Sequence, residues 1–163
     1  MRILAMSIIR SYTLKEARFL LPQLKEMIID VNSKLDDYIY IIDNLKNEYV
    51  KLANNLGLDS IELSYSRLDI NYANQLELTK ILEQMQYYEN MSKNLVIGTV
   101  ESIMDQGIVL RDLRLGLFDF PAFDRNLLYY LCWRIDEDDI NWWHSRSESF
   151  IDRKPITSLI EFI

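Results

Sequence analysis

The residues of this sequence that could carry chemistry lie between positions 112 and 155, and Asp119, Cys132 and His144 are foremost among them. A carboxylate inside an apolar strand is costly unless a cation or hydrogen-bond donors pair with it. A cysteine acts as a metal ligand or nucleophile only as the thiolate, which needs a nearby cation or metal. Imidazole can be a metal ligand, a base or a hydrogen-bond donor. The three side chains together form a candidate metal site that suits zinc or iron better than magnesium.

Each of these residues also has a structural interpretation. Asp119 stands between two phenylalanines and could form an ion pair with an arginine that holds the sheet together. Cys132 could be a small buried apolar residue, as most free cysteines are. His144 follows two tryptophans and could be a packed, hydrogen-bonded side chain. The sequence leaves both interpretations open, and with them whether the chain is an enzyme.

Further candidates for ligand binding surround these three residues; besides Asp119, they are Arg134, Glu137, Arg153, Trp133 and Trp143. An arginine can clamp an anion or a carboxylate through two parallel hydrogen bonds. A structural pair of an arginine with Asp119 or Glu137 is the alternative. The aromatic residues Tyr130, Trp133, Trp142 and Trp143 would either line a small-molecule pocket or belong to the core.

A small antiparallel sheet must position these side chains. β-Branched and aromatic residues punctuated by turns predict strands at 108–110, 115–123 and 127–135, with a last strand or helical turn at 140–144. If a two-residue turn at Arg125-Asn126 joins the two longer strands, Asp119 faces Cys132 and Leu117 faces Arg134. We therefore expect a sheet of three to four strands, with Asp119 and Cys132 side by side.

The first half of the chain predicts a long helical hairpin. Thr13 and Glu16 have the spacing of a capping box, which begins a helix. Apolar residues then recur at alternating intervals of three and four residues as far as Leu56. Gly57, which follows, is suited to cap the end of the helix. Pro22 should kink this helix. A linker at 57–67 and a second helix over about 68–104 complete the coiled-coil-like hairpin.

Length and composition set the broad class. The chain has 163 residues, and 49% of them are hydrophobic. This length and composition suit a single domain covering 1–163. Within it we expect the hairpin at about 13–105 and the sheet at about 107–155. The net charge of −7 argues against a nucleic-acid partner and against docking on an anionic membrane. One cysteine allows no intramolecular disulfide, so we expect a cytoplasmic protein. Residues 1–10 are expected to form a first strand or a packed N-terminal arm.

Several short motifs resemble one known family. They are Tyr12-Thr-Leu-x-Glu-Ala17 with Leu20-Leu21-Pro22, Gly107-Ile-Val-Leu-Arg-Asp112, Gly116-Leu-Phe-Asp-Phe-Pro121, Leu131-Cys-Trp-Arg134, Glu137, Trp143-His144, and Phe150-x-x-Arg153-x-Pro155. This set is similar to the domain of unknown function 2203 family, whose members are small prokaryotic proteins. The resemblance implies this architecture and points to these positions as candidate functional residues. It does not imply any particular reaction.

The sequence thus predicts an α+β fold, a long antiparallel helical hairpin followed by a small antiparallel sheet. Our leading interpretation is a noncatalytic homo-oligomeric assembly or binding module, most simply a homodimer, because the chain combines a heptad seam with no recognisable catalytic set. The second is a zinc- or iron-binding protein or enzyme in which Asp119, Cys132, Glu137 and His144 converge on the metal and Arg134 or Arg153 binds an anionic substrate. The third is small-molecule binding in an aromatic-lined pocket.

Overall fold

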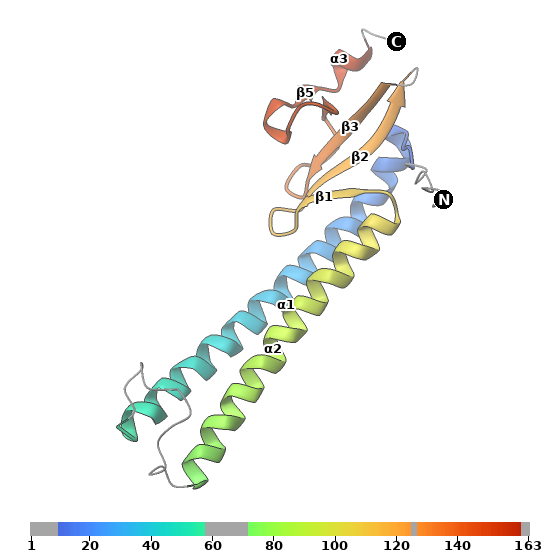
Figure 1. Ribbon diagram of the computed structural model, residues 1–163. Helices are drawn as coiled ribbons and strands as arrows, with labels where there is room; N and C mark the ends of the chain where they lie inside the picture. Colours follow the sequence, from blue (N-terminus) through green and yellow to red (C-terminus); the bar gives the residue numbers. More distant parts are fainter. Residues whose placement is uncertain (1–9, 58–71, 125–126, 161–163) are drawn as a thin grey trace, which may run out of the picture. The chain divides into compact units, whose positions relative to one another are not determined.

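The computed structural model describes residues 10–57, 72–124 and 127–160. The fold is α+β, with two long helices followed by a five-stranded antiparallel sheet (Figure 1), one strand more than the largest number expected. The elements are α1 (Leu14–Asn55), α2 (Tyr72–Asp105), β1 (Val109–Asp112), β2 (Leu117–Asp124), β3 (Leu127–Arg134), β4 (Trp142–Ser145), η1 (Phe150–Asp152), β5 (Lys154–Pro155) and α3 (Thr157–Ile160). None of the described helices carries an apolar segment long enough to cross a lipid bilayer.

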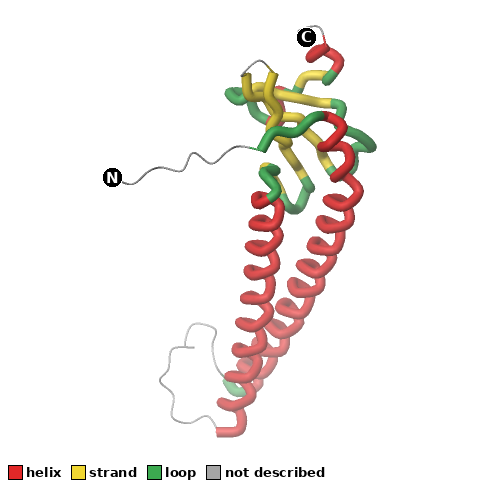
Figure 2. The backbone as a smooth tube through the Cα atoms, turned by 90° about the vertical axis from the view of Figure 1, so that its right-hand side faces the viewer, coloured by secondary structure: helices red, strands yellow, loops and turns green. Residues whose placement is uncertain are grey.

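The described residues form two compact units. One combines the residues up to Asn32 with those from Gly98 onward, and the other is Ser33–Ile97. The second unit is a helical hairpin in which α1 and α2 run side by side (Figure 2). Its seam contains the tilted rings of Tyr38 and Tyr88, whose centroids are 5.9 Å apart. The buried residues along it are Leu35, Ile42, Ala53, Leu78 and Ile81.

The predicted capping box begins α1. The Thr13 amide donates to Glu16 Oε2 at 2.8 Å, and the Glu16 amide donates to Thr13 Oγ1 at 3.2 Å. The hydrogen bonds from the Thr13 amide and hydroxyl hold the pKa of the Glu16 carboxyl below its usual value. The helix continues through Pro22 to Asn55, and Gly57, just beyond its end, has φ of +68°. Both boundaries of this helix agree with the sequence pattern.

A glycine cap joins α2 to the sheet. Gly107 has φ of +79°, its amide donates to the Met104 carbonyl at 2.8 Å, and the Ile108 amide donates to the Ile103 carbonyl at 3.3 Å. This is the Schellman arrangement, which satisfies free carbonyls at a helix end. A Cβ atom at Gly107 would lie 2.7 Å from Cβ of Arg10. Glycine is therefore required here by both the backbone angle and the space.

Three predictions fall on residues outside the described ranges. They are the N-terminal strand or arm at 1–9, the linker and helix start between 58 and 71, and the hairpin turn at Arg125-Asn126. The consequence of that turn can nevertheless be checked in the flanking strands. Asp119 pairs with Cys132 and Leu117 pairs with Arg134, so the predicted register of β2 and β3 is confirmed.

The sheet has the strand order β1-β2-β3-β4-β5, with every neighbouring pair antiparallel. Side chains alternate between its two faces. One face packs on the first turns of α1 and buries Phe118, whose ring stacks on Trp133 at 5.5 Å. The core residues on this side include Ala17, Leu21, Leu24 and Ile28 of α1 with Phe120, Ala122 and Leu131 of the sheet. The alternate residues of the same strands point to the opposite face, where the polar site lies.

Candidate functional site

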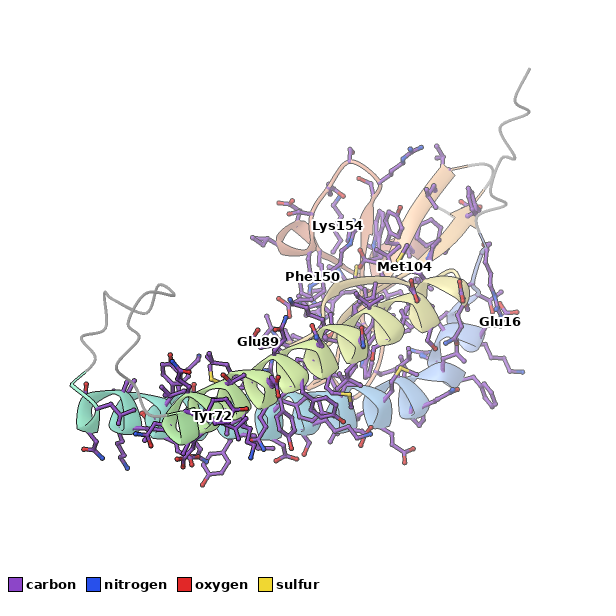
Figure 3. All side chains as sticks on the ribbon, turned by 60° about the horizontal axis from the view of Figure 1, so that its bottom comes forward. Glu16, Tyr72, Glu89, Met104, Phe150 and Lys154 are labelled. Carbon is purple, nitrogen blue, oxygen red and sulfur yellow. The ribbon has the colours of Figure 1, made fainter. Side chains whose placement is uncertain are left out.

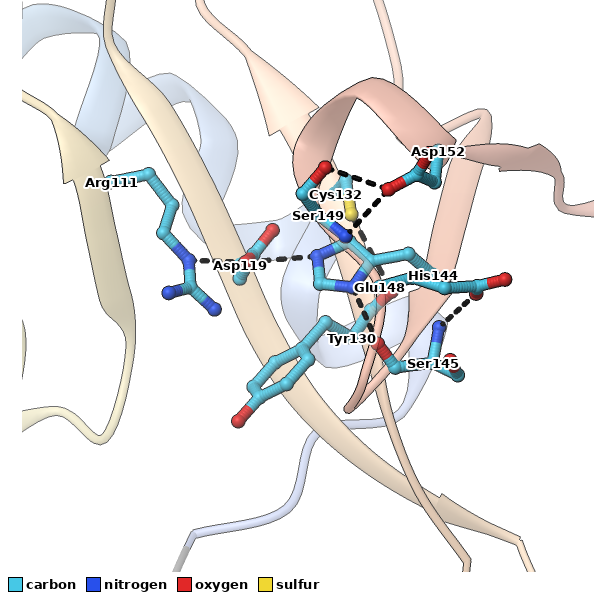
Figure 4. A network of polar contacts seen from close by, with 9 residues as sticks. All are labelled: Arg111, Asp119, Tyr130, Cys132, His144, Ser145, Glu148, Ser149 and Asp152. Carbon is cyan, nitrogen blue, oxygen red and sulfur yellow. Dashed lines mark hydrogen bonds and ion pairs between the residues drawn. The ribbon is translucent and has the colours of Figure 1, made fainter.

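Asp119, Cys132 and His144 come together on the second face of the sheet (Figure 4). They stand on the neighbouring strands β2, β3 and β4, where Asp119 pairs with Cys132 and His144 pairs with Tyr130. A carboxylate oxygen, Sγ and an imidazole nitrogen all lie within 4.8 Å of one another. The three residues are 0%, 0% and 1% exposed. The structure therefore brings together three of the four residues expected to converge on a metal, while the fourth, Glu137, pairs with Arg153 instead.

Asp119 is held through only one of its two oxygens. Oδ2 accepts a hydrogen bond from Arg111 Nε at 2.6 Å and lies 3.1 Å from His144 Nε2. Oδ1 is buried and has no hydrogen-bond partner among the described residues. A buried carboxylate oxygen without a donor is unfavourable, and either an ordered water molecule or a cation would satisfy it.

Arg111 is the member of the site that sequence reasoning missed, since Arg134 and Arg153 were the expected partners. The register of β1 against β2 shifts between Leu110 and Asp112, so Arg111 is an extra residue in the strand. Such a bulge changes the direction of a side chain and is common beside functional sites. The strand pattern of the sequence gives no sign of a bulge, and so it could not predict that the Arg111 side chain reaches Asp119, whose partner on β1 is Val109.

The hydrogen bonds of His144 determine which ring nitrogen carries a proton. Nδ1 lies 2.7 Å from the carbonyl oxygen of Ser145, which can only accept, so Nδ1 must donate. In the neutral imidazole Nε2 is then a bare lone pair, and it faces Asp119 Oδ2. Two acceptors at this distance repel each other unless a cation, either a proton or a metal ion, lies between or beside them.

Cys132 is a thiol in the absence of a metal. Burial, and then the negative charge of Asp119, raise its pKa well above the usual value. The Sγ atom donates a long hydrogen bond of 3.6 Å to the Tyr130 carbonyl. Since the thiolate is the nucleophilic form, the metal-free site is unsuited to attack by sulfur. A bound metal ion would lower this pKa and take the thiolate as a ligand.

Three of the remaining predicted ligand-binding residues, Trp133, Arg134 and Arg153, contact a fourth, Glu137. Arg153 Nη1 lies 2.9 Å from Glu137 Oε1, and both side chains are mostly buried. Glu137 Oε2 accepts from the Arg134 amide at 2.9 Å, and the Glu137 carbonyl accepts from Trp133 Nε1 at 2.9 Å. The Arg134 guanidinium pairs with Asp136 at the surface. These contacts fix the turn that follows β3, so they have a sufficient structural explanation.

The four aromatic candidates do not share one face of the sheet. Trp133 and Trp143 lie on the core side, where Trp143 meets Tyr129 edge to face at 6.1 Å. Tyr130 and Trp142 pair with His144 and Cys132 and lie on the other side. A concavity of about 870 Å³ lies away from both groups, lined by residues of the start of α1 and the segment before it, Arg10 to Leu20.

One comparison with known proteins gave a match, and the matched residues include the motifs that position this site. The profile of the DUF2203 family, described as an uncharacterized conserved protein, matches residues 10–156. The chain belongs to the DUF2203 family. Searches among curated proteins and solved structures found no match. The matched range of this DUF2203 protein contains the whole Asp119–Cys132–His144 site together with Arg111.

Proposed function

We propose that this DUF2203 protein binds a divalent transition metal, most simply zinc, through Asp119 Oδ1, Cys132 Sγ and His144 Nε2. The observation that supports the proposal is the convergence of these three different donor groups within 4.8 Å in a buried site. Carboxylate, thiolate and imidazole are the three side-chain types that bind zinc in proteins.

The spacing of the donor atoms suits a tetrahedral ion. Bonds of 2.0–2.3 Å place neighbouring zinc ligands about 3.3–3.8 Å apart. The atoms of the site lie within 4.8 Å, so contraction by about 1.5 Å or less at each pair would close the site around an ion. Rotations of the three side chains would bring the donor atoms closer while the strands that carry them keep their register.

The hydrogen bonds around the donor groups also support the proposal. A histidine ligand usually donates its second N–H to a carbonyl or carboxylate, and His144 donates Nδ1–H to the Ser145 carbonyl. A carboxylate ligand is usually held through its other oxygen, and Arg111 holds Oδ2 of Asp119. Both contacts leave the proposed ligand atoms free to bind the ion.

Metal binding would resolve both unfavourable features of the site. The ion would supply a partner for Asp119 Oδ1 and would accept the lone pair of His144 Nε2. It would also displace the proton of the Cys132 thiol, so binding would release a proton and strengthen as the pH rises. Iron(II) fits the same ligand set, and elemental analysis distinguishes the two metals.

The test is elemental analysis of the untagged protein purified without chelator. We expect near-stoichiometric zinc or iron in the natural protein and its loss in Cys132→Ala and His144→Ala variants. A matched pair of acidic variants, Asp119→Asn in the site and Asp138→Asn in the exposed turn, should lose and keep the metal respectively. Metal-free natural protein whose melting temperature does not rise on adding zinc would overturn the proposal.

A second candidate function, the assembly of a homodimer through a coiled coil, is favoured by the surface of the hairpin. Large apolar side chains remain exposed on its two helices, Tyr72 at 78% and Tyr40 at 70% (Figure 3 shows Tyr72). Exposed apolar surface of this kind often marks an interface. Light scattering tests this function, and a monomer at micromolar concentration would contradict it. For both functions we propose a cytoplasmic location, where Cys132 stays reduced.

A further inference from the structure

Arg111 places a positively charged group between the buried site and the protein surface. Its side chain is 44% exposed, whereas Asp119 beside it is fully buried. Only Nε of the guanidinium contacts Asp119, and the two terminal nitrogens form no hydrogen bond to another residue of the described part of the chain. The guanidinium carbon lies 5.5 Å from the centre of the Tyr130 ring, which supports it from one side. The outer edge of this guanidinium is therefore fixed in position and available.

The charge of the site changes when a metal binds. Without metal, the negative charge of Asp119 balances the positive charge of Arg111. With a divalent ion, the Asp119 carboxylate and the Cys132 thiolate together balance the ion, and neutral His144 adds no charge. The charge of Arg111 is then left uncompensated beside a buried centre. A half-exposed guanidinium that has lost its counter-ion attracts an anion from solution, so the loaded site favours an anion.

The coordination number leads to the same conclusion. Three protein ligands are present among the described residues, and a zinc ion with three protein ligands keeps its fourth position for water or substrate. The terminal nitrogens of Arg111 form a planar fork that matches the oxygens of a carboxylate or a phosphate. Arg111 stands on β1, the outermost strand of the sheet, and its half-exposed guanidinium is accessible to solvent.

Resting on the metal site proposed above, we infer that the loaded protein binds the oxyanion group of a small molecule, a carboxylate or a phosphate, between the fourth metal position and the guanidinium of Arg111. Binding requires the metal, since Arg111 is neutralised by Asp119 in its absence. Arg111 determines the ligand class, because a charged fork selects an oxyanion over a neutral group.

Cobalt(II) makes this inference measurable, because the visible absorption of bound cobalt responds to its ligands. The cobalt-loaded protein is titrated separately with acetate and with phosphate, which distinguishes the two kinds of oxyanion. We expect a saturable spectral change with at least one of them. The Arg111→Gln variant should bind that anion about 10- to 100-fold more weakly. Arg114→Gln, a change of the same type in the turn after β1, should bind it as the natural protein does.

Each failure has a separate meaning. If the protein takes up cobalt but its spectrum changes with neither anion, the inference is overturned and the proposed metal site is not affected. The same conclusion follows if Arg111→Gln binds the anion as tightly as the natural protein does. Protein that takes up no cobalt overturns the proposed function itself. Because Arg111→Gln also removes the partner of a buried carboxylate, Arg111→Lys is a second variant. It keeps the charge without the fork, and it should fold, load cobalt and bind the anion more weakly than the natural protein.

Discussion

His144 Nε2 lies 3.1 Å from Asp119 Oδ2, while the other ring nitrogen of His144 is committed to the Ser145 carbonyl. The pair therefore needs a cation, and a proton and a metal ion are the two that the site can hold. A protonated histidine beside a carboxylate would explain this one contact. It would leave Asp119 Oδ1 unpartnered, whereas a metal ion bound as we propose would have all three donors as ligands.

Removing the carboxylate should destabilise the metal-free protein. Asp119→Ala leaves His144 and the guanidinium of Arg111 without their partner, and we expect the free energy of unfolding to fall by about 2–3 kcal/mol. Part of the Arg111 interaction is screened by water, since that side chain is half-exposed, and this keeps the loss below the value for a fully buried pair. Urea denaturation in the presence of chelator measures the change.

Asp138→Ala is the control for that experiment. Asp138 is exposed in the turn before β4, and a surface substitution of this kind changes stability by about 0.5 kcal/mol or less. If both variants lost equally little free energy of unfolding, the Asp119 carboxylate would not contribute to the stability of the sheet.

The Cys132 thiol should be unreactive in the folded, metal-free protein. Burial raises its pKa, so almost no thiolate is present at neutral pH, and the sulfur is shielded from reagents. A disulfide reagent such as Ellman's should modify Cys132 slowly at pH 7.5 and rapidly once urea unfolds the chain. Complete modification of the native protein within the time needed for the unfolded one would contradict the buried site.

The same thiol should make the metal-free protein less stable at high pH. Its pKa is raised in the folded state, so the folded chain holds this proton more tightly than the unfolded chain does. The stabilisation is complete below the unfolded pKa of about 8.5 and is lost as the pH rises above it, at up to about 1.4 kcal/mol per pH unit. Thermal melts between pH 8 and 10 measure it. A Cys132→Ala variant should lose this part of the dependence, and identical slopes would refute the explanation.

Gly107, just after α2, and Gly98, inside α2, should respond to alanine in opposite ways. Gly107→Ala places a Cβ atom 2.7 Å from Cβ of Arg10 at a φ of +79°, and we expect a loss of about 1–3 kcal/mol. Gly98→Ala lies inside the helix with no other atom within 4 Å of the new Cβ, and we expect a gain of about 0.5–1 kcal/mol. Chemical denaturation of both variants tests whether Gly107 caps the end of α2. Equal changes in the free energy of unfolding for the two variants would exclude that role.

The extent to which the sequence predicted the structure depends on how local each signal is. The heptad seam and the capping box are local, and α1 begins and ends as they predict. Asp119 and Cys132 could be paired because alternation and a short turn determine a hairpin register. Strand β5, at Lys154–Pro155, was missed because two residues show no periodicity. Arg111 was missed because a bulge changes the direction of a side chain without changing the strand pattern.

X-ray absorption at the zinc edge of the zinc-loaded protein tests the metal site most directly, because it reports the atoms bound to the ion. We predict one sulfur at about 2.3 Å with nitrogen and oxygen neighbours at about 2.0 Å, and loss of the sulfur signal in Cys132→Ala. A shell of oxygen and nitrogen alone in the natural protein would place the zinc elsewhere on the chain and contradict the proposed site.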